Sequence, residues 1–199
     1  MTLKLTIAVI ATSIGASCAT APRTTSAAPV VPMGDLIFVA DPGIRAESAT
    51  LPVVRATDDG WEMVYVDPSL GRPVAAESQD GLAFSPAARV PPREVTEAPS
   101  TVALADGSMR LFVSLAEGII SFRSTDAGRT FTPERGTRLT PDDFDSPVVH
   151  AMVSPTPIRL ADGRFRLYVA AISSRGPVVL SATTPVAAPE PVILASPVR

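Results

Sequence analysis

The side chains most capable of chemistry gather in one short stretch of the chain. Asp142, Asp143 and Asp145 are followed by His150, the chain's single histidine. Two carboxylates held across a glycosidic bond can act as acid and base, or as acid and nucleophile. Asp143, Asp145 and His150 are therefore candidate catalytic residues, and Asp142 is a candidate ligand-binding residue. The alternative is a solvated loop, because Pro141 followed by Asp142 typically starts a turn.

Two arginines could act beside these carboxylates. Arg55 and Arg159 fall at equivalent places in two repeated segments, where guanidinium groups could grip an anionic sugar. Repeated arginines of this kind also commonly bond neighbouring carbonyls where two repeats meet, which is the alternative. The carboxylates at 142–145 could attract calcium, but their spacing matches no calcium loop. The sequence therefore predicts no metal and no cofactor.

Composition narrows the fold and the class of partner. The chain has 199 residues, of which 46% are hydrophobic and 5% aromatic, and 21 are prolines. This length suffices for one domain, and so many prolines favour short strands and turns over long helices. The formal net charge of -3 comes without any basic run, so nucleic acid is not expected as a partner. One Cys and one His exclude an internal disulfide framework and a Cys/His metal cage within the chain.

The first residues resemble a signal for export. Residues 1–17 combine a basic start, a short apolar stretch and small residues, which is typical of a signal peptide. The small residues before Cys18 resemble the bacterial lipobox, although Gly15 stands where leucine is usual. We expect Cys18 to be lipidated, and residues 18–33, rich in Ala, Pro, Ser and Thr, to tether the rest to the membrane of the cell envelope. The alternative is a secreted or periplasmic soluble protein.

Residues 34–199 are predicted to form one domain built from a repeat. Three copies lie at about residues 51–92, 98–140 and 154–199, and each has an Asp-Gly pair with an aromatic residue five positions after the glycine. Asp-Gly pairs flanked by alternating apolar residues predict tight hairpins. Each copy is long enough for four short strands, so the sequence predicts an all-β fold of four-stranded antiparallel blades, as in a β-propeller. Residues 35–40 could add one more strand.

A second repeated motif resembles the Asp box, also called the bacterial neuraminidase repeat. The clearest copy consists of Ser124, Asp126, Gly128, Thr130 and Phe131. A shorter variant consists of Ser78, Asp80, Gly81 and Phe84. Residues 181–184 resemble a decayed third copy that begins at Ser181. The pattern is similar to that of sialidases and other Asp-box, glycosidase-like propellers, which implies that the box residues are scaffold and lie away from the substrate.

The same resemblance implies that ligands meet loops on one face of the propeller. The corresponding loops are residues 43–50, 67–72, 91–100, 115–118, 141–156 and 172–176. A sialidase also needs clustered arginines and an activated tyrosine, but the first clamp arginine of the family is replaced here by the Thr-Leu-Pro segment at 50–52. Tyr65 and Tyr168, the only tyrosines, recur at the repeat position of Phe112 and are expected to pack in the core.

These observations predict a function with one alternative. We expect an envelope-anchored, sialidase-like propeller module that binds a glycan or another partner. The alternative is an exo-acting glycoside hydrolase, either sialidase-like or of the five-bladed type that uses two carboxylates, whose opening Asp-Pro is weakly resembled by Asp41-Pro42. Propellers typically close with four to eight blades, and only three are clear in the sequence. Self-association could therefore complete the ring.

Overall fold

The described part of the chain, residues 36–88 and 100–186 of a computed structural model, is all-β. Its helical content is one 3-10 turn, η1 (Pro141–Asp143), and no helix in this part is long and apolar enough to cross a membrane. The all-β fold predicted from the repeats is confirmed. The expected signal peptide, Cys18 and the tether lie outside the described residues.

Three antiparallel sheets, which we call blades I, II and III, contain all the strands of the described part. Blade I consists of β3 (Thr50–Thr57), β4 (Gly60–Asp67), β5 (Arg72–Ser78) and β6 (Ser85–Pro86). Blade II consists of β7 (Thr101–Ala103), β8 (Met109–Leu115), β9 (Gly118–Ser124) and β10 (Thr132–Pro133). Blade III consists of β11 (Val149–Arg159), β12 (Phe165–Ser173), β13 (Gly176–Thr183) and β1 (Val39–Ala40), with β2 (Ala46–Glu47) also paired to β13.

The fourth strand of blade III comes from the beginning of the domain. Val39 pairs with Thr183, and Ala40 pairs with Ala182, in antiparallel register. The extra strand expected within residues 35–40 therefore exists as β1. The third repeat, expected to be complete within residues 154–199, begins at Val149 and takes its outer strand from a segment that precedes the first repeat.

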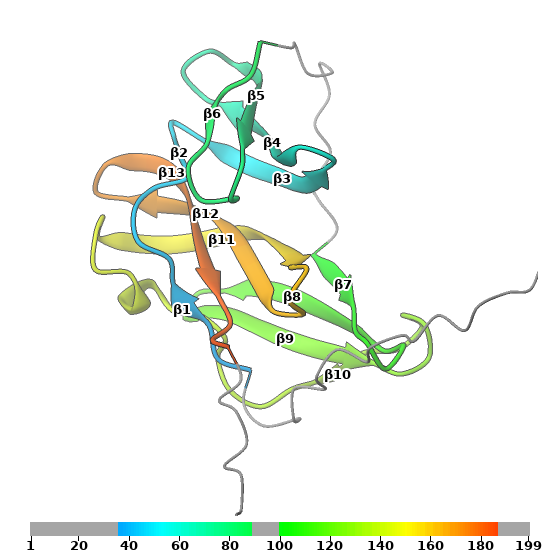
Figure 1. The fold of residues 1–199 in the computed structure, drawn as a ribbon. Coiled ribbons are helices and arrows are strands. Elements are labelled where there is room, and N and C mark those ends of the chain that lie inside the picture. The colour runs from blue at the N-terminus through cyan, green and yellow to red at the C-terminus, as the bar shows by residue number, and fades with distance from the viewer. Residues whose placement is uncertain (1–35, 89–99, 187–199) are drawn as a thin grey trace, which may run out of the picture.

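Blade III lies between blades I and II (Figure 1). Strand β11 contacts β3 of blade I on one side and β8 of blade II on the other. Among the described residues, no strand of blade I makes a substantial contact with a strand of blade II. The sheets therefore follow one another in the spatial order II, III, I, although the order along the chain is I, II, III.

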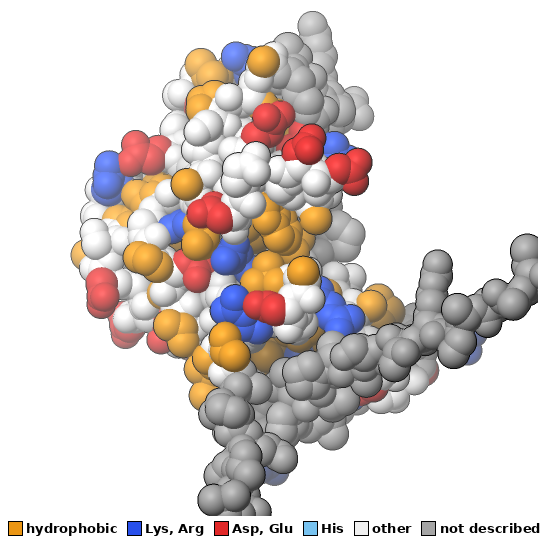
Figure 2. Space-filling view, in the orientation of Figure 1, with side chains coloured by type: hydrophobic (Ala, Val, Ile, Leu, Met, Phe, Trp, Pro, Cys, Tyr) orange, Lys and Arg blue, Asp and Glu red, His pale blue; other side chains and the backbone are white. Residues whose placement is uncertain are grey.

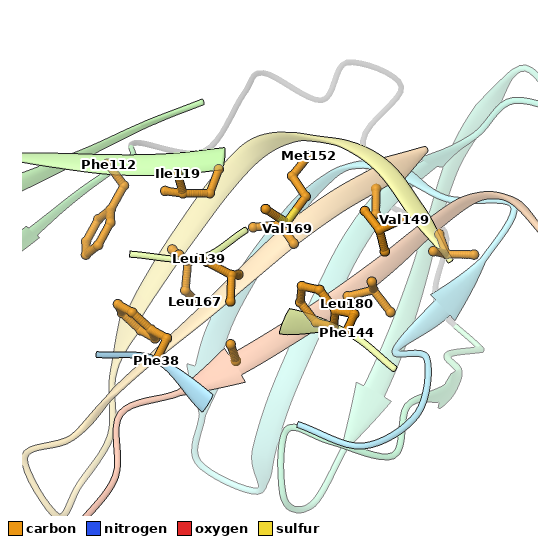
Figure 3. Packing of buried hydrophobic residues seen from close by; sticks show 13 residues of the cluster. Phe38, Phe112, Ile119, Leu139, Phe144, Val149, Met152, Leu167, Val169 and Leu180 are labelled. Atoms are coloured by element: carbon orange, nitrogen blue, oxygen red, sulfur yellow. The ribbon is translucent and has the colours of Figure 1, made fainter. Parts of the chain in front are cut away.

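Two apolar clusters hold the blades together. The larger one joins blades II and III, where Phe112 and Ile119 pack against Leu167, Val169 and Leu180 (Figure 3). Its remaining buried members are Phe38, Leu139, Phe144, Val149, Met152, Ala171, Val178 and Ala182. The smaller cluster joins blades III and I, and its buried members are Ala49, Val54, Met63, Tyr168 and Val179. Each cluster thus spans two blades, so the arc depends on contacts between sheets.

Strand pairing shows which positions are equivalent among the blades. One residue at the start of the second strand faces the serine of the motif that resembles the Asp box, which we call the Asp box of that blade. In blade I, Trp61, the second residue of β4, pairs with Ser78, and in blade II, Met109, the first residue of β8, pairs with Ser124. In blade III this residue is Phe165, and its carbonyl accepts a hydrogen bond from the Thr184 backbone at 2.8 Å. Thr184 therefore takes the place of the box serine that the sequence pattern had assigned to Ser181.

Two other pairs of residues that the sequence pattern makes equivalent do not match in the structure. In blade I the turn glycine, Gly60, is itself a paired strand residue, whereas in blade III the glycine lies inside the turn. Arg55 faces Glu62, and the matching pair in blade III is Ile158 with Arg166, so Arg159 is not the counterpart of Arg55. Tyr168 lies three residues after Phe165, whereas Tyr65 lies four residues after Trp61, so the two tyrosines are not equivalent either.

Candidate functional site

Each blade has two ends that carry different kinds of residues. The Asp-Gly turns and the Asp boxes lie at one end, which we call the Asp-box end. The β4–β5, β8–β9 and β12–β13 turns lie at the other end together with residues 140–148, and we call it the loop end. The loop end lies on the left in Figure 1.

In the blade II Asp box, the carboxylate accepts hydrogen bonds from residues of its own loop. Asp126 accepts hydrogen bonds from the Thr130 backbone at 2.9 Å, from the Thr130 hydroxyl at 2.6 Å and from the Ser124 hydroxyl at 2.7 Å. The Gly128 backbone donates to Ser124 Oγ at 2.8 Å. The bonds from Thr130 are the main reason that the pKa of Asp126 falls from 3.8 to about 2. Such a carboxylate stays ionised and organises a turn.

The blade I Asp box has similar internal bonds and also contacts blade III. Asp80 accepts from the backbones of Leu82 and Ala83 at 2.7 and 3.0 Å, and these bonds hold its pKa at about 2. From blade III, Arg166 donates to the Asp80 carbonyl at 2.8 Å and Tyr168 donates to the Gly81 carbonyl at 2.7 Å. This box therefore also joins two sheets.

A polar triad recurs at the same place in blades II and III. In blade II, Arg110 forms two hydrogen bonds with Glu134, at 2.6 and 2.8 Å, and Ser121 donates to the same carboxylate at 2.6 Å. Burial of Glu134 opposes its ionisation, but the bonds from Arg110 and Ser121 outweigh that effect and lower its pKa. An arginine, a carboxylate and a serine thus cross three strands of one sheet.

The blade III triad consists of Arg166, Asp41 and Ser181. Ser181 donates to Asp41 at 2.6 Å, and the Arg166 guanidinium lies 3.5 Å from the same carboxylate. Asp41 directly follows β1, as Glu134 directly follows β10. The triad therefore ties the beginning of the domain to the end of blade III.

Blade I lacks this triad. Its corresponding residues are Glu62, Ala75 and Ala87, and Glu62 pairs with Arg55 of the adjacent strand. The backbone hydrogen bond at this position is nevertheless present. The Ala87 amide donates to the Ala75 carbonyl at 2.9 Å, as the Glu134 amide donates to the Ser121 carbonyl in blade II. Blade I thus carries a carboxylate where the other two blades carry an arginine.

At the loop end, the four candidate residues of the sequence have different surroundings. The Asp143 carboxylate accepts hydrogen bonds from the Thr140 backbone at 2.6 Å and from the Thr140 hydroxyl at 2.9 Å, so it closes the turn η1. Asp142, Asp145 and His150 are exposed. The described residues contain no group of three or more His, Cys, Asp or Glu side chains that could hold a metal ion.

Exposed apolar side chains lie next to these polar residues. His150 falls in a bulge of β11, between Val149 and Ala151, and Ala151 pairs with Ile172. Val148 and Ile172 are 59% and 55% exposed. Figure 2 shows acidic side chains together with apolar ones at the edge of the molecule that carries η1. The loop end of blade III therefore presents carboxylates and apolar groups side by side to solvent.

The candidate arginines lie at the other end of the blades. Arg159 is the last residue of β11, whose first residue follows the acidic loop, so the length of this strand, about 30 Å at the usual rise per residue, separates them. Arg55 lies near the β3–β4 turn and donates to Glu62 from Nε at 2.5 Å. The structure thus does not bring Arg55 or Arg159 together with Asp142.

The two tyrosines are set in the interface between blades III and I. Burial raises the pKa of the Tyr168 phenol, and its hydroxyl donates to the Gly81 carbonyl. Burial and the nearby Asp67 also raise the pKa of Tyr65. A nucleophilic tyrosine needs the opposite, a phenol that is more easily ionised, so neither environment favours that chemistry.

Sequence reasoning missed the triads, although half of their signal is present in the sequence. Arg110 and Arg166 each follow the first residue of a repeated strand, within Met-Arg-Leu-Phe and Phe-Arg-Leu-Tyr. Their carboxylate partners directly follow the fourth strands, one of which lies far away along the chain. Comparison of the chain with protein-family models and with curated proteins gave no match. The assignment of a function therefore depends on the geometry of the chain itself.

Proposed function

We propose that the chain is an envelope-anchored, sialidase-like propeller module that binds a glycan without cleaving it. The single observation that carries this proposal is the loop end of blade III, which carries both the exposed carboxylates of Asp142 and Asp145 and the exposed side chains of Val148 and Ile172. Carboxylates accept strong hydrogen bonds from hydroxyl groups, and apolar side chains pack against the C–H faces of a sugar ring. This combination suits a polyhydroxylated ligand.

The charge of this surface favours a neutral glycan over an acidic one. Residues 140–150 contain three aspartates and no Lys or Arg. A sialic acid or uronic acid would bring its carboxylate next to these aspartates, and like charges repel at short range. Arg55 and Arg159, the arginines expected to grip an anionic sugar, lie at the Asp-box end.

The same geometry gives little support to hydrolysis. Catalytic carboxyl groups act at sites from which most water is excluded, and Asp142 and Asp145 are exposed. Asp143 is engaged in closing η1 through Thr140. Binding is therefore the function that these residues can perform as they stand.

A glycan array with matched variants tests the proposal. The wild-type chain should be retained by neutral glycans, and Asp142→Ala combined with Asp145→Ala should abolish retention. Arg159→Ala, at the other end of β11, is the control and should bind as wild type. An array without signal, or loss of binding by the control alone, would refute the proposal. Turnover of a fluorogenic sialoside or arabinoside that Asp143→Asn abolishes would replace it with the hydrolase alternative.

A further inference from the structure

The two interfaces inside the chain are built from the same strand positions. In the second strand of each blade, counted from Trp61, Met109 or Phe165, the second and fourth residues and their neighbours on that side form what we call the leading face. The first, third and fifth residues form the trailing face. The leading face of blade II packs on the trailing face of blade III, through Phe112 and Leu167. The leading face of blade III packs on the trailing face of blade I, through Tyr168 and Met63.

Two faces remain without a partner blade in the described part of the chain. They are the leading face of blade I and the trailing face of blade II, because blades I and II make no substantial contact there. By strand alternation and pairing, the trailing face of blade II consists of Met109, Leu111, Val113, Ile120 and Phe122. All five side chains are apolar and partly exposed.

The same positions of blade III show what such a face looks like when it is covered. The equivalents of Leu111, Val113, Ile120 and Phe122 are Leu167, Val169, Leu180 and Ala182, by strand pairing. All four blade III residues are 0% exposed, because blade II covers them. Blade II thus repeats the apolar pattern of an interface, and an exposed apolar face of this kind usually marks an interaction site.

The leading face of blade I is complementary in character. Val64 and Val66 are partly exposed on this face, and Glu77 adds an exposed carboxylate, whereas Glu62 is buried and paired with Arg55. The Asp box of blade II, whose Gly128 lies against Met109 on the trailing face, contributes the exposed Arg129. The exposed carboxylate of Glu77 on one face and the arginine beside the other favour contact between the two.

We propose that a second copy of this chain covers these faces, so that blade I of each copy packs on blade II of the other. Two arcs of three blades then close into a six-bladed ring with two-fold symmetry, and six lies within the usual range for propellers. Each new interface repeats the contact of a leading face with a trailing face that already exists twice inside the chain. The proposal rests on the blade arrangement and is independent of the ligand at the loop end.

The mass of the full chain in solution tests this directly. Cys18→Ser is used throughout, so that neither lipidation nor a disulfide between copies contributes. Analytical ultracentrifugation should give the mass of two chains, falling to one chain on dilution. Val64→Arg and Val113→Glu, on the two open faces, should each halve the mass. Leu70→Glu, at an exposed apolar residue of the β4–β5 turn, is the control and should remain a dimer.

Mixing the two variants separates this ring from other dimers. In a mixed pair, one interface joins the unmodified blade I of one copy to the unmodified blade II of the other, so a dimer should reappear. Glu77→Arg and Arg129→Glu change only exposed side chains and should weaken the dimer without affecting the fold. A monomer at every concentration would overturn the proposal. A dimer that survives Val113→Glu alone, or a mixture that stays monomeric, would overturn it as well.

Discussion

The Asp41 carboxylate accepts a hydrogen bond from Ser181 Oγ at 2.6 Å, across 140 positions of the chain. The backbones of the same two residues are also joined, by a 2.9 Å bond from the Asp41 amide to the Ser181 carbonyl. This pair fastens the beginning of the domain to the last strand of blade III, so the middle blade of the arc is made from both ends of the described chain.

The Asp-box carboxylates should titrate well below ordinary aspartates. Hydrogen bonds to the ionised form lower the pKa of both Asp80 and Asp126 to about 2. A lowered pKa in the folded state stabilises the protein above the ordinary value of 3.8, and this contribution is lost as the pH falls towards 2. Carboxyl resonances followed by NMR should therefore show both groups ionised at pH 3. Midpoints near 3.8 would contradict the bonding described for the boxes.

Gly81→Ala should destabilise the chain more than Gly107→Ala. Both glycines have positive φ, at 71° and 81°. An added Cβ at Gly81 would lie 2.7 Å from Arg166 and 2.8 Å from the Tyr168 hydroxyl, whereas nothing lies within 4 Å of a Cβ at Gly107. We expect a loss of about 1 kcal/mol for the control and of about 2–3 kcal/mol for Gly81→Ala in denaturant unfolding. Equal losses of unfolding free energy would show that the Asp box of blade I does not pack closely against blade III.

Arg110→Met should cost more stability than Arg164→Met. The side chains of Arg110 and Glu134 are 11% and 19% exposed, so removing the arginine leaves a largely buried carboxylate with fewer donors. Arg164 pairs with Asp162 at an exposed turn, where 32% and 51% of the side chains are accessible. Loss of hydrogen bonds to a charged group costs about 1.5–3 kcal/mol, and an exposed ion pair contributes less than about 1 kcal/mol. Thermal unfolding of the two variants would reveal the difference, and a reversed order would contradict a structural role for the triad.

Much of the fold could be predicted from the sequence because its signals are local. The Asp-Gly turns, the alternating apolar residues and the serine and aspartate of each box act within a few neighbouring residues. The box of Ser124, Asp126 and Gly128 has the internal hydrogen bonds that its spacing suggests. Strand β1 could also be anticipated from residues 35–40.

The rest depends on pairing over long distances, which spacing alone does not encode. Nothing local indicates that Asp41 meets Arg166, or that blade III lies between the other two. The equivalence of Arg55 and Arg159 was wrong because the turn glycine enters the strand in blade I and stays in the turn in blade III. The loop end could be located from repeat positions, but the bonds from Thr140 to Asp143 depend on the local path of the backbone, which the spacing of the aspartates does not reveal.

The pairing of β1 with β13 can be tested by one engineered disulfide. Ala40 and Ala182 are partners in this pairing, next to the hydrogen-bonded pair of Asp41 and Ser181, so they form a pair without mutual hydrogen bonds. Such pairs have Cα atoms about 4.5 Å apart, which suits a disulfide. Ala40→Cys with Ala182→Cys, in a Cys18→Ser background, should oxidise readily in the folded chain and raise its melting temperature. The control is Ala40→Cys with Ala56→Cys. Ala56 lies in β3 of blade I, which does not pair with β1, so both thiols should stay free. If the thiols introduced at positions 40 and 182 stay reduced, β1 does not pair with β13 and the N-terminal strand does not complete blade III.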